Sequence, residues 1–484
     1  MTMTRTKTGI ASLALLCGLG VLVMACPASL DDFCADGACA PRPIAVEGGG
    51  TDADSGADAP MPDPCIDNPT ALSCLDETTA LFVSNPNGID QDPAAGSRAK
   101  PFKTINAAIA KIDVKRRRIY VCEGSYFEDI VLNSAHSSLS VFGGVDCAWN
   151  ANAAIKPIIG ASANPLKIDG SVAIAFADVA VVAKDATSGS SIAAFVNGGD
   201  TTLKRVRLSA GKGADAKDAD IVPFANFPAQ ADLNGVMAAD TINGGAGGKY
   251  TCPGGLKTAG GKGGDVGNPG EPGTPGPANG GLVSNCSGNL TGAAGSAGQN
   301  GAGALTAGDL RADGWFAAAG MPGATGGPGQ GGGGGFGVMG AGGGGGAGGC
   351  GGAGGAAGTG GGASIALAAY LANVTLESST LEATLGGRGA KGSVGQNGQT
   401  IFGFRGTGSG NACNGGAGGP GASGGIGGGG AGGSSLGFVY KGPSPTLDAQ
   451  TEGAISSGKK GSGGAPAGGL AGVDGAQGKE LKLP

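Results

Sequence analysis

Few side chains of this sequence are suited to acid–base or nucleophilic chemistry. His136 is the only histidine, and no serine, cysteine or aspartate stands at an evident catalytic spacing from it. We therefore expect His136 to be a surface-loop residue and not a catalytic one. Residues 453–460 nearly spell a phosphate-binding loop, but Lys460 replaces the hydroxyl residue that would hold magnesium. Gly-x-Gly-x-x-Gly recurs through composition alone, so these motifs indicate no nucleotide site.

Cysteine offers a different chemistry near the N-terminus. Arg5 and Lys7 precede an apolar run at residues 10–25, and Cys26 follows directly. A short basic segment before a short apolar core is typical of a secretory signal. Residues 23–26, Val-Met-Ala-Cys, resemble the lipobox of bacterial lipoproteins, which implies acylation of Cys26 and anchoring through acyl chains. The alternative is an ordinary secretory signal in which Cys26 is incidental.

The remaining cysteines indicate disulfides. Of the 12 cysteines, Cys17 lies in the signal and Cys26 is the anchor, which leaves ten. An even number in an exported chain favours a disulfide framework. Their spacing does not fix the connectivity, and pairing of neighbours along the chain is the simplest expectation. No Cys-x2-Cys pair is present, so we expect neither a metal nor another cofactor. The ten candidates are Cys34, Cys39, Cys65, Cys74, Cys122, Cys147, Cys252, Cys286, Cys350 and Cys413.

Charge and composition set the first boundaries. The net charge of −6 argues against nucleic acid as a partner. Acidic residues concentrate in residues 26–78, where Pro, Gly, Ser and Ala fill much of the rest. We expect this segment to be an extended, solvated linker between the membrane and a folded part. The signal peptide would occupy residues 1–25.

Residues 79–210 carry the clearest structural pattern. Ile105, Ala108, Ile109 and Ile112 form one apolar stripe, which predicts a helix over 105–112 with Thr104 as its cap. Short Val-, Ile- and Ala-rich runs separated by turns predict strands. These runs are residues 81–83, 118–122, 130–132, 139–142, 166–168, 172–176 and 179–182.

This region resembles the N-terminal part of pectin-lyase-like right-handed parallel β-helix proteins. The matching stretches are residues 83–96, 101–108 (Pro-Phe-Lys-Thr-Ile-Asn-Ala-Ala) and 121–126 (Val-Cys-Glu-Gly-Ser-Tyr). The resemblance implies an all-β solenoid whose first turn is covered by a short capping helix. Such a cap protects an open end that would otherwise expose apolar interior and strand edges.

The resemblance also raises the question of catalysis. Many such proteins cleave acidic polysaccharides, using clustered aspartates for calcium with an arginine base, or paired carboxylates. The candidates here are Asp169, Asp178, Asp185, Arg205 and Arg207. They match no signature of the family, and charged residues on a solenoid are usually its solvated face. We therefore expect a non-catalytic protein, with a polysaccharide lyase or glycoside hydrolase as the alternative.

Three similar segments begin at residues 190, 363 and 434, and each leads into a glycine-rich stretch. Each is interpreted as two strands of one coil, the third being degenerate. The expected domains are thus β-helix at 79–210, 363–385 and 434–456, glycine-rich insertions at 211–362 and 386–433, and a glycine-rich tail at 457–484. Glycine accounts for 107 of the 484 residues.

Three alternatives exist for the glycine tracts. Short Gly-x-y runs, such as residues 264–276 and 415–427, suggest collagen, but they break after a few triplets. Disorder is the second alternative. The third is a bundle of extended polyglycine-type helices with three residues per turn, joined by backbone hydrogen bonds. Cysteines inside the tracts favour the third, because cross-links reduce the entropy of long loops.

These patterns together predict an exported lipoprotein in the bacterial envelope. Pro27 follows Cys26 in place of the aspartate associated with inner-membrane retention, which favours the outer membrane or cell surface. The expected role is structural, adhesive or in matrix contact. The expected partners are the membrane, through the lipid anchor, and a polysaccharide or another surface protein. A pure spacer without a ligand is a further alternative.

Overall fold

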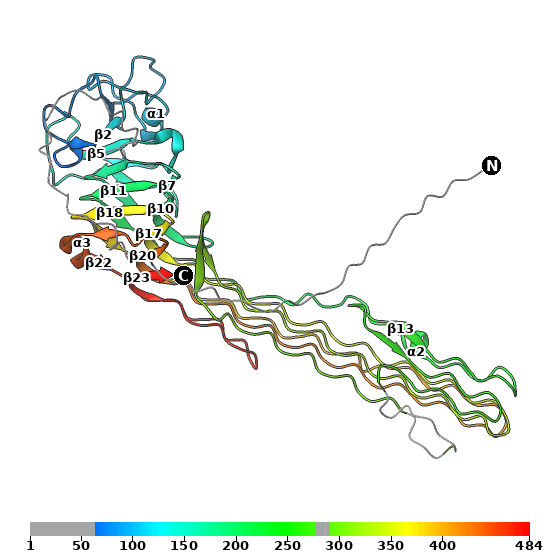
Figure 1. Ribbon diagram of the computed structural model, residues 1–484. Coiled ribbons are helices and arrows are strands. Elements are labelled where there is room, and N and C mark those ends of the chain that lie inside the picture. Colours follow the sequence, from blue (N-terminus) through cyan, green and yellow to red (C-terminus); the bar gives the residue numbers. More distant parts are fainter. Residues whose placement is uncertain (1–62, 277–285, 287–290) are drawn as a thin grey trace, which may run out of the picture. The chain divides into compact units, whose positions relative to one another are not determined.

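The computed structural model describes residues 63–276, 286 and 291–484. Most of its regular structure is β, arranged in three parallel sheets (Figure 1). The first sheet has the order β1 (Ala80–Val83), β2 (Arg118–Cys122), β5 (Ser140–Val145), β8 (Ile174–Ala177), β11 (Asp200–Lys204), β18 (Asn373–Glu377) and β21 (Thr446–Leu447). The second has β3 (Ser125–Tyr126), β6 (Ile158–Ile159), β9 (Ala180–Val182), β12 (Arg207–Ser209), β19 (Thr380–Glu382) and β22 (Ile455–Ser456). The third has β4 (Ile130–Asn133), β7 (Leu166–Asp169), β10 (Ser191–Asn197), β17 (Ser364–Tyr370), β20 (Ser435–Lys441) and β23 (Gln477–Leu483).

The chain visits these sheets in turn, so each repeat contributes three strands. The expectation of two strands per repeat is wrong, because residues 202–208 form β11 and β12 rather than one strand. Arg205 interrupts the run with a left-handed backbone, φ 54°. Asp178 and Ser378 take the same conformation between β8 and β9 and between β18 and β19. A left-handed residue is uncommon outside glycine, and here it makes a tight corner between two sheets.

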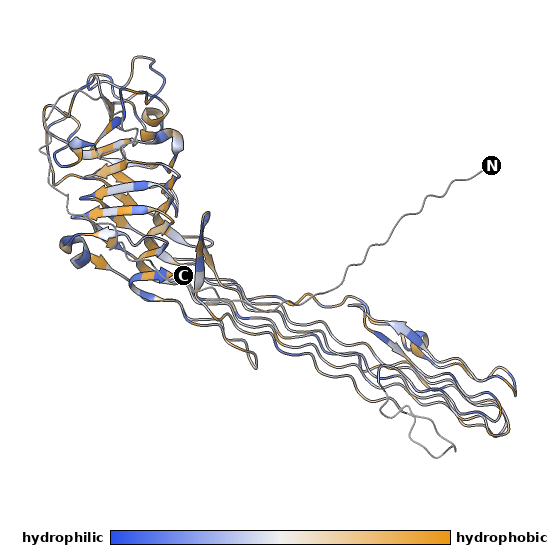
Figure 2. Ribbon diagram, in the orientation of Figure 1, coloured by the Kyte–Doolittle hydropathy of each residue, from blue (hydrophilic) through white to orange (hydrophobic). Residues whose placement is uncertain are grey.

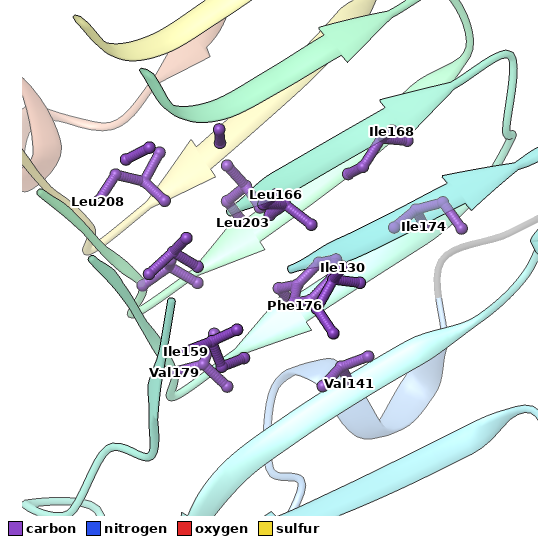
Figure 3. Close-up of a cluster of buried hydrophobic side chains, with 14 of the residues drawn as sticks. Ile130, Val141, Ile159, Leu166, Ile168, Ile174, Phe176, Val179, Leu203 and Leu208 are labelled. Carbon is purple, nitrogen blue, oxygen red and sulfur yellow. The ribbon is translucent and has the colours of Figure 1, made fainter. Parts of the chain in front are cut away.

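One apolar interior lies between the three sheets. We call the three sheets and this interior the three-sheet body. Leu203 pairs in register with Phe176 on one side and Leu376 on the other. Leu208 lies in the same way between Val181 and Leu381. These side chains are buried, and Figure 3 shows Leu203, Leu208 and their neighbours directed into the space between the sheets. Each buried Leu, Ile or Phe contributes roughly 1.5–3 kcal/mol of transfer free energy. Figure 2 shows hydrophobic stretches recurring on the stacked strands.

The expected N-terminal helix is confirmed as α1 (Ile105–Ile109), which is shorter than residues 105–112. Thr104 caps it, its hydroxyl accepting from the N–H of Ala107 at 3.2 Å. The Glu128 carboxylate accepts from the N–H groups of Ile105 and Asn106, both at 2.9 Å. Ile105 and Ile109 pack into the interior cluster beside β1 and β2. This short helix is stable because its free N–H groups are satisfied and its apolar face is buried.

Residues 63–78 depart from the expected linker, because they fold against the first sheet. A 3₁₀ helix, η1 (Pro64–Ile66), and a Cys65–Cys74 disulfide shape this segment. It covers the outward side chains of Phe82, Tyr120 and Phe142 on the first sheet. The Tyr120 hydroxyl donates to two of its carbonyls, and burial raises the pKa of this phenol. The composition of residues 63–78 did not predict this contact. The contact forms because the outer face of the first sheet carries large aromatic side chains, which are buried by the covering segment.

The glycine tracts are held together by backbone hydrogen bonds between extended segments that lie side by side (Figure 1). We call these segments the glycine bundle. Within it, consecutive N–H groups of the run at residues 342–346 point to different segments. The acceptors for Gly344, Gly345 and Gly346 are Val236, Gly261 and Gly416, and donors to their carbonyls are Gly406, Gly248 and Gly332, all at 2.7–3.0 Å. One segment therefore has six hydrogen-bonded neighbours. The direction repeats after three residues, since Ala347 donates to Leu233, on the segment of Val236.

Such close approach explains why the central positions are glycine. A Cβ added to Gly345 would lie 2.0 Å from the carbonyl oxygen of Gly332, and one added to Gly346 would lie 2.1 Å from that of Gly403. Real Cβ atoms never come so near a backbone oxygen. The order of the described parts of the tracts thus agrees with the third alternative from the sequence.

Two disulfides cross-link the glycine bundle, and they do not join neighbouring cysteines along the chain as expected. Cys65–Cys74 and Cys122–Cys147 join neighbours along the chain, as expected. Within the bundle, however, Cys252 pairs with Cys350 and Cys286 with Cys413. The chain runs back and forth, so cysteines distant in sequence become neighbours in space. Cys26, Cys34 and Cys39 lie outside the described residues.

The insertions and the tail contain further elements that composition did not predict. Residues 477–483, expected in the glycine-rich tail, form β23 and extend the third sheet beside β20. The described part of the first insertion contains two antiparallel hairpins: β13 (Lys249–Thr251) with β14 (Lys257–Ala259), and β15 (Gly308–Arg311) with β16 (Gly314–Ala317). The other short helices are α2 (Gln230–Leu233), α3 (Ala449–Gly453) and η2 (Ser134–His136).

Candidate ligand groove

Of the acidic and basic candidates from the sequence, the structure pairs only Asp178 with Arg205, and the others lie apart. Asp169 accepts from the side-chain amide of Asn197 at 2.7 Å, at the end of β7. Asp185 accepts from the N–H of Lys212 at 2.7 Å. Each carboxylate thus caps or pairs a local group on a different part of the three-sheet body.

The two arginines are likewise engaged in ion pairs. Arg205 donates two hydrogen bonds of 2.8 Å to the Asp178 carboxylate, whose side chain is only 6% exposed. This hydrogen bonding raises the pKa of the Arg205 guanidinium further. Arg207 donates twice to Glu382 at the surface. Within the described residues, no three His, Cys, Asp or Glu side chains gather where they could hold a metal ion.

The other motifs from the sequence have local roles in the fold. His136 ends the 3₁₀ turn η2, and its Nδ1 accepts from the N–H of Asn133 at 3.0 Å. This agrees with the expected surface position. Residues 453–460 begin at the last residue of α3 and continue into β22, so the near-match to a phosphate loop lacks the helix that should follow it.

A hairpin from the glycine-rich insertion covers the outer face of the third sheet. Ile192, Ile365 and Leu436 lie in register on β10, β17 and β20 and form an apolar strip on this face. Leu310 and Trp315 of the β15–β16 hairpin pack against the strip and are nearly fully buried. Covering it removes apolar surface from water, which is the main favourable term in folding.

Glycine permits this hairpin to close over its own tryptophan. A Cβ added to Gly308 would lie 2.6 Å from Trp315 Cζ2. The indole is therefore packed directly on the backbone of β15. Its Nε1 is buried without a hydrogen-bond partner among the described residues.

A groove of about 390 Å³ remains between this hairpin and strands β4, β7 and β10. Phe195 and Trp315 contribute buried aromatic surface to its lining, and Phe316 is 38% exposed. Three charged side chains also line the groove, Asp129, Lys167 and Asp313, and we call these three the rim. An apolar floor with a few polar groups at the rim is typical of small-ligand sites.

Two of the charged rim residues, Asp129 and Lys167, contact neighbouring groups. Asp129 accepts from the N–H groups of Ala161 and Ser162, at 3.3 and 3.0 Å. The Lys167 ammonium lies 5.9 Å from the centre of the Phe195 ring. The guanidinium carbon of Arg311 lies 4.6 Å from the centre of the Phe316 ring. This cation–π contact holds the Phe316 ring in place beside the groove.

Sequence reasoning missed this groove because part of its lining, residues 313–316, comes from the glycine-rich insertion. The signal that was available is the stretch 308–317, Gly-Asp-Leu-Arg-Ala-Asp-Gly-Trp-Phe-Ala. Asp313-Gly314 directly before the apolar run 315–317 is typical of a tight hairpin. A larger hollow of about 490 Å³ beside the Cys286–Cys413 disulfide is lined mostly by small bundle residues, and the chemistry of its lining is poorer.

Comparisons of this chain with protein-family models, curated proteins and solved structures find no match. In the part of the chain that the structure describes, no helix has the length and apolar character needed to cross a bilayer.

Proposed function

We propose that this protein is an exported, non-catalytic lipoprotein of the bacterial cell surface. Acylation of Cys26 would anchor it, with the outer membrane as the expected destination. Four disulfides among the described residues support an oxidising compartment. Three stacked parallel sheets with an N-terminal helical cap support a right-handed parallel β-helix of the pectin-lyase-like kind. The three-residue period of the bundle's hydrogen bonds supports polyglycine-type extended helices.

The proposed role is adhesion or matrix contact through a glycan held in the groove. The observation that carries it is the pairing of Phe195, Trp315 and Phe316 with a polar rim in one hollow. Sugar rings present an apolar C–H face and a polar hydroxyl edge. An aromatic floor with carboxylate and ammonium groups around it suits both surfaces.

A glycoside hydrolase is the second candidate, and one observation favours it. Asp129 and Asp313 both line the groove, and they come from different elements. Two carboxylates that flank a bound sugar are the minimum set for such hydrolysis. The dispersed candidates Asp169, Asp178 and Asp185, each with its own partner, do not support a lyase.

The decisive experiment incubates the full chain with a panel of acidic and neutral polysaccharides. Co-sedimentation and the appearance of new chain ends are recorded together. We expect binding without new ends, and at least a tenfold loss of binding in Phe316→Ala. Phe127→Ala is the matched control, because Phe127 is 74% exposed and is not among the residues that line the groove. New ends that disappear in Asp313→Asn would establish the hydrolase instead. If no polysaccharide binds, the remaining functions are a spacer without a ligand and contact with another surface protein.

A further inference from the structure

The turns of the glycine bundle carry exposed apolar side chains that the fold does not require. Five large residues on neighbouring turns form what we call the turn patch: Met237, Ile242, Val266, Val338 and Met339, which are 63%, 61%, 44%, 40% and 71% exposed. Turns ordinarily use Gly, Pro, Asn, Asp and Ser. Clustered exposed hydrophobic residues on a soluble surface mark interaction sites.

Main-chain hydrogen bonds place these turns side by side. The N–H of Val266 donates to the carbonyl of Ile242 at 2.9 Å, and the N–H of Gly337, next to Val338, donates to Asn268 at 3.0 Å. Ala238, next to Met237, donates to Thr407 at 3.0 Å. The patch is therefore built from three turns and an adjoining segment that are bonded to one another.

Two opposite charges without an ion-pair partner accompany the patch. Asp240 lies in the first turn, where its carboxylate accepts from the N–H groups of Ile242 and Asn243. Arg405 is exposed, two residues before Thr407, beside the segment of Met237. Neither forms an ion pair with any described residue, whereas the nearby Lys262 and Asp265 pair at 3.1 Å. The four charges sum to zero, so two such surfaces do not repel.

We propose that the turn patch binds the turn patch of a second copy of this chain. In a two-fold contact the same surface of both copies is used, so a residue pair between the copies occurs twice. Arg405 of one copy would face Asp240 of the other, and the apolar side chains would be buried between them. One acid and one base beside the same patch are what a self-complementary contact needs. Copies on two opposing surfaces would then adhere to each other. This contact is separate from the groove and does not depend on a glycan.

The oligomeric state of the full chain tests this proposal. All samples carry Cys26→Ser, which removes the proposed acylation site, and contain no polysaccharide. Sedimentation over a range of concentrations should reveal a monomer–dimer equilibrium that weakens as salt rises. We expect at least a tenfold weaker dimer in Met237→Ser and in Asp240→Asn, a change that preserves the oxygen accepting the turn's N–H groups. Beads coated with the chain should clump, and the same variants should disperse them.

Met321→Ser is the matched control, since Met321 is also on the bundle, outside the turn patch, and 64% exposed. Its dimer should equal that of the parent chain. A monomer at every concentration overturns the proposal, as does a dimer that Met237→Ser and Met321→Ser weaken equally. A monomer that co-sediments with phospholipid vesicles through Met237 would assign the patch to a lipid surface and also overturns it.

Discussion

Arg205 and Asp178 occupy equivalent left-handed corners of consecutive repeats, and their side chains join those corners by two hydrogen bonds of 2.8 Å. The Asp178 side chain is almost fully buried, and Arg205 also donates to the carbonyl of Ile66 in the covering segment. One ion pair thus links two repeats to the segment that covers the first sheet.

We expect Asp178→Asn to destabilise the chain by about 3 kcal/mol, because it leaves a partly buried guanidinium without its counter-charge. Asparagine tolerates the left-handed backbone, so strain does not confound the result. Arg207→Ala is the control: its pair with Glu382 is solvent-exposed, and the expected loss is at most about 1 kcal/mol. Urea unfolding measures both, and equal losses would contradict this account.

A single methyl group should disrupt the glycine bundle. Gly345→Ala places a Cβ 2.0 Å from a carbonyl oxygen, and we expect a loss of about 3 kcal/mol from forced overpacking. A Cβ at Gly453, in α3, would meet nothing within 4 Å, so Gly453→Ala should be neutral or stabilise by about 0.5–1 kcal/mol. Amide hydrogen exchange locates the effect. Unchanged protection of residues 342–346 in Gly345→Ala would be the contrary result.

The bundle should weaken in acid. Hydrogen bonding from the N–H of Gly244, and then from Lys262, lowers the pKa of Asp265 from its usual 3.8. A lowered folded-state pKa means that the contribution is fully present above the unfolded value and is lost as pH falls through the folded one. The stability difference between the parent chain and Asp265→Asn should therefore be constant above about pH 5 and shrink below pH 4. A difference that grows on acidification would reverse the sign we assign.

Peptide mapping without reduction tests the cross-links of the bundle. We expect fragments that join Cys252 to Cys350 and Cys286 to Cys413, with sequence separations of 98 and 127 residues. Loops of this length give disulfides their largest entropic effect, about 4–5 kcal/mol in the chain-entropy treatment. The double substitution Cys252→Ala, Cys350→Ala should therefore expose the bundle to protease while the three-sheet body resists. Fragments joining Cys252 to Cys286 would show a different fold of the tracts.

Acylation is tested by labelling cells with an alkyne fatty acid. The chain should incorporate the label and partition with membranes, and Cys26→Ser should abolish both. Mass spectrometry of the mature N-terminus is the independent measurement. A mature chain that begins elsewhere, with an unmodified Cys26, would favour the ordinary secretory signal.

Local patterns predicted the parts of the fold that depend on nearby residues. The stripe from Ile105 to Ile109 and the Thr104 cap gave the helix, because capping and apolar spacing act within one turn. The corner at Arg205 was missed because the run 202–208 was interpreted as one strand, although Lys204 and Arg205 break its polar–apolar alternation between Leu203 and Val206. The groove was missed for a different reason: Trp315 meets Phe195 only after a long insertion returns to the body.

The six hydrogen-bonded neighbours of the run at residues 342–346 have a consequence for temperature. Unfolding most domains raises the heat capacity because apolar groups become hydrated, whereas hydration of exposed peptide groups lowers it. The glycine bundle buries peptide groups almost without apolar side chains. Its melting should thus show a small or negative heat-capacity change, so its stability would not fall on cooling as that of an apolar core does.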